Sequence, residues 1–163
     1  MKLAEVAKVL QILETIGRLE VTMAEFYATC AEVWTADSSF WQGLQVEEHQ
    51  HSQNIEKMAA IITRRQDHFE LNRAFNPTAI NTFIAYVTSM IQRVREQREP
   101  RLEPAQVLAM ARDMEQSIIE GKYNEIVKTN DAEYLRMTRG ILADTLVHRN
   151  KIADRLVAVS KTH

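Results

Sequence analysis

Apolar side chains recur every three or four residues over long stretches of this chain, and this period restricts the possible folds more than any other feature of the sequence. Such a period is typical of amphipathic helices that bury one face. Only 4 glycines and 3 prolines interrupt the 163 residues, so few tight turns are available. The strong helix formers Ala, Leu, Glu, Gln, Arg and Met are abundant. The sequence therefore predicts an all-α fold built from long helices.

Five helical segments follow from the positions of the apolar residues, at about 3–35, 39–64, 77–97, 104–128 and 131–161. The starts of three of these segments contain residues that are typical of helix caps. Asp37 or Ser38 can cap the second segment, and Asn76 followed by Pro77 is typical of a helix start, with the proline at the first helical position. The stretch "TND" at 129–131 can cap the last segment.

The polar stretch "RRQDHFELNRAFNP" at 64–77 has no clean helical period, and we interpret it as a connection that crosses the bundle. Long helices, short breaks and one long middle connection predict an antiparallel four-helix bundle. The segment 77–97 is then either an additional helix at the side or part of the crossover between the two halves. We see no linker composition, so we expect one domain over residues 1–163.

Charge and cysteine usage argue against several functional classes. The net charge of −2, with both signs mixed, provides no basic surface for nucleic acid or for an anionic membrane. No run approaches the ~18 uninterrupted apolar residues of a membrane span. The N-terminal stretch contains Glu5 and Glu14 and has no apolar core of a secretory signal. Because Cys30 is the one cysteine, neither an internal disulfide nor a Cys-x-x-Cys metal site can form. We therefore expect a cytoplasmic protein.

The stretch "QVEEHQHSQ" at 45–53 places two Glu and two His within nine residues. On a helix, Glu48 and His51 share the apolar stripe, whereas Glu47 and His49 fall beside it and should be wetter. A buried carboxylate without a partner costs several kcal/mol. Glu48-x-x-His51 is therefore either a hydrogen-bonded pair in the core or half of a metal site.

Three more polar residues interrupt apolar stripes on other helical segments. They are Glu20 in the first segment, Glu115 in the fourth and His148 in the last. Glu20 precedes His51 along the chain by nearly the same spacing as Glu115 precedes His148, which suggests two similar helical hairpins. A Glu from each of two helices, with Glu-x-x-His from the other two, is the ligand pattern of di-iron carboxylate bundles. Oxygen and imidazole ligands of this kind suit iron and manganese.

Across nearly its whole length the chain resembles the rubrerythrin-like branch of the ferritin-like superfamily. The resemblance is carried by "LEVTMAEFYATCA", "QVEEHQHSQ", "ARDMEQSIIEGKY" and "LADTLVHRNKI". It implies a ferritin-like bundle with two iron ions, and it implies metal ligands at Glu20, Glu48, His51, Glu115 and His148. Tyr27 and Tyr123 are expected either to hydrogen-bond a ligand carboxylate or to pack as core aromatics.

The sequence departs from this family at the second Glu-x-x-His element. Thr145 stands where the family has a Glu that bridges the two metals, and Asp144, one residue earlier, is a candidate substitute ligand. Ile118 stands where rubrerythrin proper has a further Glu. The site is therefore expected to hold two ions as in the family or a single one, with zinc and manganese as alternatives to iron. One cysteine cannot build the four-cysteine iron domain of rubrerythrin, so redox chemistry would need an external electron donor.

Three functions remain open from the sequence. The first is a di-iron oxidoreductase that reduces peroxide or oxygen, or that oxidises ferrous iron. The second is a metal-binding protein without turnover, which holds one ion at Glu20, Glu48 and His51. The third is a metal-free helical interaction module whose polar core residues hydrogen-bond one another. Long amphipathic helices also make a homodimer a reasonable expectation.

Overall fold

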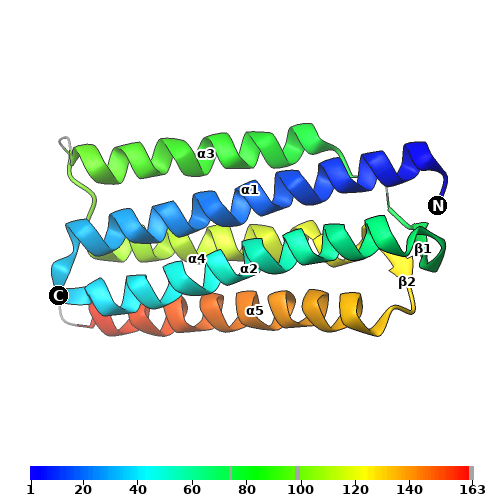
Figure 1. The fold of residues 1–163 in the computed structure, drawn as a ribbon. Helices are drawn as coiled ribbons and strands as arrows, with labels where there is room; N and C mark the ends of the chain where they lie inside the picture. Colours follow the sequence, from blue (N-terminus) through cyan, green and yellow to red (C-terminus); the bar gives the residue numbers. More distant parts are fainter. Residues whose placement is uncertain (74, 98–99, 162–163) are drawn as a thin grey trace.

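The computed structural model describes residues 1–73, 75–97 and 100–161, and within these it contains five long helices and one small sheet (Figure 1). The elements are α1 (Leu3–Val33), α2 (Ser38–Arg64), β1 (Phe69–Leu71), α3 (Pro77–Glu96), α4 (Pro104–Gly121), β2 (Val127–Thr129) and α5 (Ala132–Ser160). The predicted all-α class is confirmed in the long helices, whereas the two-stranded sheet was not predicted. None of the described helices combines the length and the apolar character that crossing a membrane requires.

Two of the predicted helix starts have the expected caps. The Asn76 side chain accepts a hydrogen bond from the backbone N–H of Thr78 (2.9 Å), with Pro77 as the first helical residue. The Asp131 side chain accepts hydrogen bonds from the backbone N–H groups of Glu133 and Tyr134, both at 3.1 Å. These side chains satisfy amide groups that have no partner within the helix.

The fourth helix is shorter than predicted, because it ends at Gly121 and not near residue 128. Lys122 has a left-handed backbone conformation (φ 52°), which breaks the helical hydrogen-bond pattern. A short 3₁₀ turn, Tyr123–Glu125, then leads into β2. The β-branched Val127 and Thr129 suit a strand better than a helix end.

The same sheet also changes the interpretation of the connection at 64–77. Within that stretch, β1 pairs antiparallel with β2, with Phe69 opposite Thr129 and Leu71 opposite Val127. This two-stranded sheet, at the end of the bundle where α2 ends and α5 begins, joins the two connections (Figure 1). The Asp131 carboxylate, 2.7 Å from the Arg65 guanidinium, adds a second tie between the two connections.

Four helices form the bundle and α3 lies outside it. In Figure 1, α1 and α2 run antiparallel as one hairpin, α4 and α5 as another, and α3 lies along the outer side of α1. The extra segment is therefore a side helix, and because it carries the chain back along the bundle it also forms part of the crossover. This arrangement places α1, α2, α4 and α5 around a common interior.

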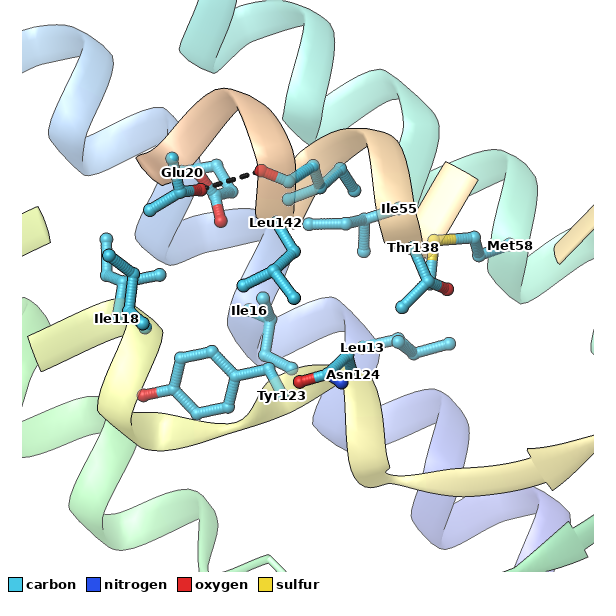
Figure 2. A pocket seen from close by; sticks show the side chains of 13 residues that line it. Leu13, Ile16, Glu20, Ile55, Met58, Ile118, Tyr123, Asn124, Thr138 and Leu142 are labelled. Carbon is cyan, nitrogen blue, oxygen red and sulfur yellow. Dashed lines mark hydrogen bonds between the residues drawn. The ribbon is translucent and has the colours of Figure 1, made fainter. Parts of the chain in front are cut away.

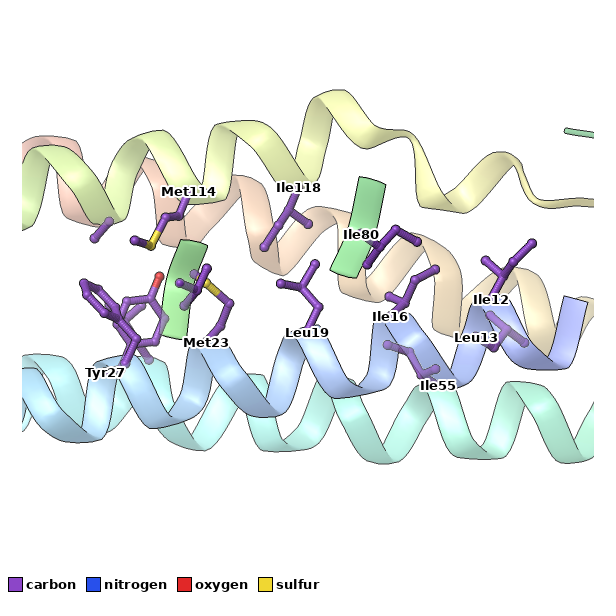
Figure 3. Close-up of a cluster of buried hydrophobic side chains, with 14 of the residues drawn as sticks. Ile12, Leu13, Ile16, Leu19, Met23, Tyr27, Ile55, Ile80, Met114 and Ile118 are labelled. Carbon is purple, nitrogen blue, oxygen red and sulfur yellow. The ribbon is translucent and has the colours of Figure 1, made fainter. Parts of the chain in front are cut away.

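Apolar side chains from these helices form a continuous core. Figure 3 shows α1 contributing Ile12, Leu19 and Met23 between α4, which contributes Ile118, and α2, which contributes Ile55. Burying an aliphatic side chain of this size contributes about 1.5–3 kcal/mol to folding. Because the core extends along most of α1, any polar group inside it needs a specific partner.

Candidate metal centre

Five polar side chains from the four bundle helices meet in this apolar interior. Glu20 comes from α1, Glu48 and His51 from α2, Glu115 from α4 and His148 from α5, and each is at most 2% exposed. Each of these residues points inward because it lies on the apolar stripe of its helix. The structure therefore brings together five of the six residues predicted as ligands, and their role as ligands remains a prediction.

These five residues form two groups that share Glu48. Glu20, Glu48 and His51 offer ligand atoms within 4.8 Å of one another, and so do Glu48, Glu115 and His148. One Glu48 oxygen lies 3.0 Å from Nδ1 of His51, and the other lies 2.9 Å from Nδ1 of His148. Glu20 and Glu115 lie 3.6 and 3.7 Å from the same two nitrogens. The centre is thus nearly symmetric about the Glu48 carboxylate.

The two imidazole rings stack against each other at the middle of the centre. The ring centroids of His51 and His148 lie 5.4 Å apart, with 24° between the ring planes. Both rings turn Nδ1 toward the buried carboxylates. Their Nε2 atoms face outward, toward carboxylates at the edge of the bundle.

Those outer carboxylates belong to Asp144 and Glu47, and each reaches across to the other helix. Asp144 of α5 lies 3.4 Å from Nε2 of His51, while Glu47 of α2 contacts Nε2 of His148. Their side chains are 59% and 43% exposed. Carboxylates in this position orient metal-binding imidazoles and raise their basicity.

This geometry changes the interpretation of both residues. Asp144 lies at the outer nitrogen of His51 and outside the two groups, because one residue along a helix turns a side chain about 100°. Glu47 was expected to be merely a wetter neighbour, yet it contacts His148 and lies 3.4 Å from Lys151. The sequence places each acidic residue four positions before a histidine of its own helix, so it does not indicate that each one contacts the histidine of the other helix.

A buried tyrosine supports one of the carboxylates. The Tyr27 hydroxyl donates a hydrogen bond to Oε1 of Glu115, and its ring stacks on Trp41 with the centroids 5.9 Å apart. Of the two alternatives for Tyr27, the structure therefore shows the hydrogen bond to a candidate ligand. Tyr123 instead lines a cavity beside Glu20.

The other oxygen of Glu115 indicates where a cation would fit. Oε2 of Glu115 is buried and has no hydrogen-bond partner among the described residues. A buried polar atom without a partner costs about 1–3 kcal/mol, and more when it is charged. A cation held between Glu115, Glu48 and His148 would satisfy this oxygen, so the residues present fit a metal ion.

Three groups of the centre have raised pKa values. Burial and the neighbouring Glu48 carboxylate raise the pKa of Glu20 to about 8. Burial alone would lower the pKa of each histidine, but the adjacent carboxylates outweigh it. Glu20 and Glu48 raise the pKa of His51 to about 11, and Glu115 and Glu48 raise the pKa of His148 to about 10. A divalent ion would take the place of the protons on these groups.

Thr145 occupies the position equivalent to Glu48 in the second half of the centre. It stands three residues before His148, as Glu48 stands three residues before His51. Its side chain is buried, and its hydroxyl donates a hydrogen bond to the backbone carbonyl of Ile141 (2.8 Å). The centre therefore has one central carboxylate, Glu48, where full symmetry would give two.

No family model matches this chain, and no curated protein or solved structure matches it. The interpretation of this centre as a metal site therefore depends on the side chains themselves. Buried carboxylate oxygens and imidazole nitrogens form a ligand set that suits iron, manganese or zinc.

Proposed function

We propose that this chain is a ferritin-like protein of the rubrerythrin-like branch that binds two divalent metal ions and works as a di-iron oxidoreductase. Its reaction would be the reduction of peroxide or oxygen, or the oxidation of ferrous iron. The observation that carries the proposal is the pair of buried groups that share Glu48. One ion would be held by Glu20, His51 and one oxygen of Glu48, and the other by Glu115, His148 and the second oxygen of Glu48.

The buried carboxylates offset most of the charge of a divalent pair. Glu20, Glu48 and Glu115 bring three negative charges against the four positive charges of two divalent ions. A centre that holds both ions therefore has one net positive charge. A nearly neutral total matters in the bundle interior, because an uncompensated buried charge costs several kcal/mol.

The protein's own residues would orient the ligands and exclude water. Glu47 and Asp144 hold the outer nitrogens of the two imidazoles, which keeps both Nδ1 atoms turned inward. The hydrogen bond from Tyr27 holds the Glu115 carboxylate in place. Bound iron would supply the ferrous–ferric cycle that passes electrons to peroxide or oxygen. An external donor would resupply those electrons, because the chain has a single cysteine, which is buried.

A second candidate function is metal binding without turnover. Thr145 favours it, because a neutral side chain replaces the second central carboxylate and weakens the centre's ability to stabilise higher oxidation states. Glu115 argues against a metal-free structural role, since a purely hydrogen-bonded core would leave Oε2 buried without a partner.

The test is anaerobic loading with ferrous iron, followed by elemental analysis and an absorption spectrum after oxidation. The proposal predicts about two iron ions per chain, as in di-iron bundles. It also predicts peroxide consumption when a chemical reductant is supplied. Bound iron without peroxide or oxygen turnover, and without oxidation of added ferrous iron, would favour the second function. A protein that binds no iron, zinc or manganese would contradict both.

A further inference from the structure

A small apolar cavity adjoins the metal centre on the side of Thr145. It has a volume of about 50 Å³ and reaches between α4 and α5. Figure 2 shows Glu20 at one end of its lining and Tyr123 and Asn124 at the other, with Ile16 and Leu142 between them. Glu20 and Thr145 are the polar lining residues next to the centre, while Asn124, which is exposed, marks the solvent end.

The polar end of this cavity coincides with the place where the centre lacks a carboxylate. Thr145 is the counterpart of Glu48, but its side chain is too short and carries no charge. With two divalent ions bound, the three buried carboxylates leave one positive charge, and among the described residues only the half-exposed side chains of Glu47 and Asp144 lie near enough to offset it. A single negative charge delivered through the cavity would balance it.

The remaining lining selects against a highly polar molecule. Ile16, Ile55, Ile118 and Leu142 are among the side chains that surround the middle of the cavity. Ions such as phosphate or sulfate would have to leave their hydration shells against these aliphatic groups. The volume of about 50 Å³ is about a third of that of an engineered cavity that accepts benzene, so only a few atoms of a ligand can be enclosed.

We propose that this cavity binds a short aliphatic monocarboxylate, with its carboxylate toward Glu20 and Thr145 and its hydrocarbon chain among the isoleucines. The carboxylate supplies the negative charge that Thr145 does not, and the chain replaces water in the apolar lining. This inference rests on the proposed function, because the charge that attracts the carboxylate comes from two bound ions.

The test uses the zinc-loaded protein, since zinc is redox-inert and the readout is binding and not turnover. Zinc per chain is first counted by elemental analysis. Calorimetric titration with sodium propionate should then show one site per chain. The zinc-loaded protein should bind propionate at least about tenfold more tightly than it binds propionamide, the neutral analogue. It should also bind propionate at least about tenfold more tightly than the metal-free protein does. A tenfold difference is equivalent to about 1.4 kcal/mol.

Two variants separate the cavity from general effects. Leu142→Trp fills the cavity and should weaken propionate binding at least about tenfold, whereas Leu146→Trp, at an exposed leucine on the same helix, should not. Thr145→Glu adds the carboxylate within the protein, so it should keep the zinc content and lose propionate binding. This second variant decides the question if Leu142→Trp fails to fold.

The zinc content and the propionate titrations together distinguish a failure of this inference from a failure of the proposed function. Two zinc ions per chain with no preference for propionate over propionamide would overturn this inference and leave the proposed function standing. Unchanged propionate binding in Thr145→Glu would overturn it as well. A protein that takes up no zinc, iron or manganese would overturn both the inference and the proposed function.

Discussion

The Glu48 carboxylate and the His148 imidazole, one hundred residues apart in the chain, meet in the bundle interior with Oε1 2.9 Å from Nδ1. The other oxygen of Glu48 lies 3.0 Å from Nδ1 of His51. Glu48 is thus the one carboxylate among the described residues that belongs to both candidate metal groups. The two halves of the centre depend on each other through this side chain.

Removing the Glu48 carboxylate should therefore remove most of the bound metal. We expect Glu48→Ala to lower the metal content from about two ions per chain to well below one, because both groups lose a shared ligand. Glu48→Gln, which conserves size, should do the same with less effect on folding. Elemental analysis after gel filtration measures this, with Glu56→Ala, an exposed position on the same helix, as the control. Unchanged metal in both Glu48 variants would refute the assignment of the site.

Supplying the missing carboxylate should strengthen metal binding. Thr145 is buried and lines the same cavity as Glu20. We expect Thr145→Glu to reach two ions per chain at lower free metal than the parent protein, because four carboxylates balance two divalent ions. Ala143→Glu, at an exposed position on α5, should have no such effect. A Thr145→Glu variant that only loses stability would show that this position does not face the ligands.

The stability of the metal-free protein should fall as the pH rises. His51 and His148 have folded-state pKa values raised to about 11 and about 10, above the ordinary value of 6.5. Below pH 6.5 both the folded and unfolded states hold these protons, so the stabilisation is complete. Above it the unfolded state loses them first, and the stabilisation declines until the folded pKa is passed. Glu20 acts in the same direction between 4.5 and about 8.

Thermal unfolding followed by circular dichroism at pH 6.5, 8 and 9.5 checks this dependence. The midpoint of the metal-free protein should decrease along the series, and His148→Gln should flatten the decrease. Metal-loaded protein should show a weaker dependence, because the metal binds the deprotonated ligands. A midpoint that rises with pH in metal-free protein would contradict the proposed proton distribution.

Removing the Tyr27 hydroxyl should destabilise the centre. Tyr27→Phe leaves a buried Glu115 carboxylate without its hydrogen-bond donor, and we expect a loss of about 1–3 kcal/mol in the unfolding free energy of the metal-free protein. Urea denaturation measures the change. Tyr86→Phe, at a side chain that is 45% exposed, serves as the control and should change stability by less than about 0.5 kcal/mol. Equal effects in the two variants would show that the hydrogen bond contributes little.

The helices and the inward polar residues follow from the sequence because both depend on one local rule. On a helix, Glu20, Glu115 and His148 can share a face with their apolar neighbours only by pointing into the core. Their convergence then needs only helices that pack around one interior. For these residues, the helical period of the apolar positions is enough to predict that the side chains face the core.

The end of α4 and the outer carboxylates follow less readily, because they depend on partners distant in the chain. Val127 is in a strand that pairs with the distant Leu71, and no local period shows that pairing. Glu47 and Asp144 lie beside the apolar stripe, where a side chain is usually solvated. Their contacts depend on how closely α2 and α5 approach, which a single sequence does not specify.

Anomalous diffraction from crystals loaded with ferrous iron, recorded on both sides of the iron absorption edge, tests the central claim most directly. The predicted result is two iron peaks, one among Glu20, Glu48 and His51 and the other among Glu48, Glu115 and His148. Iron found only at surface carboxylates, or no iron peak near Glu48 in crystals that contain iron, would contradict the proposed centre.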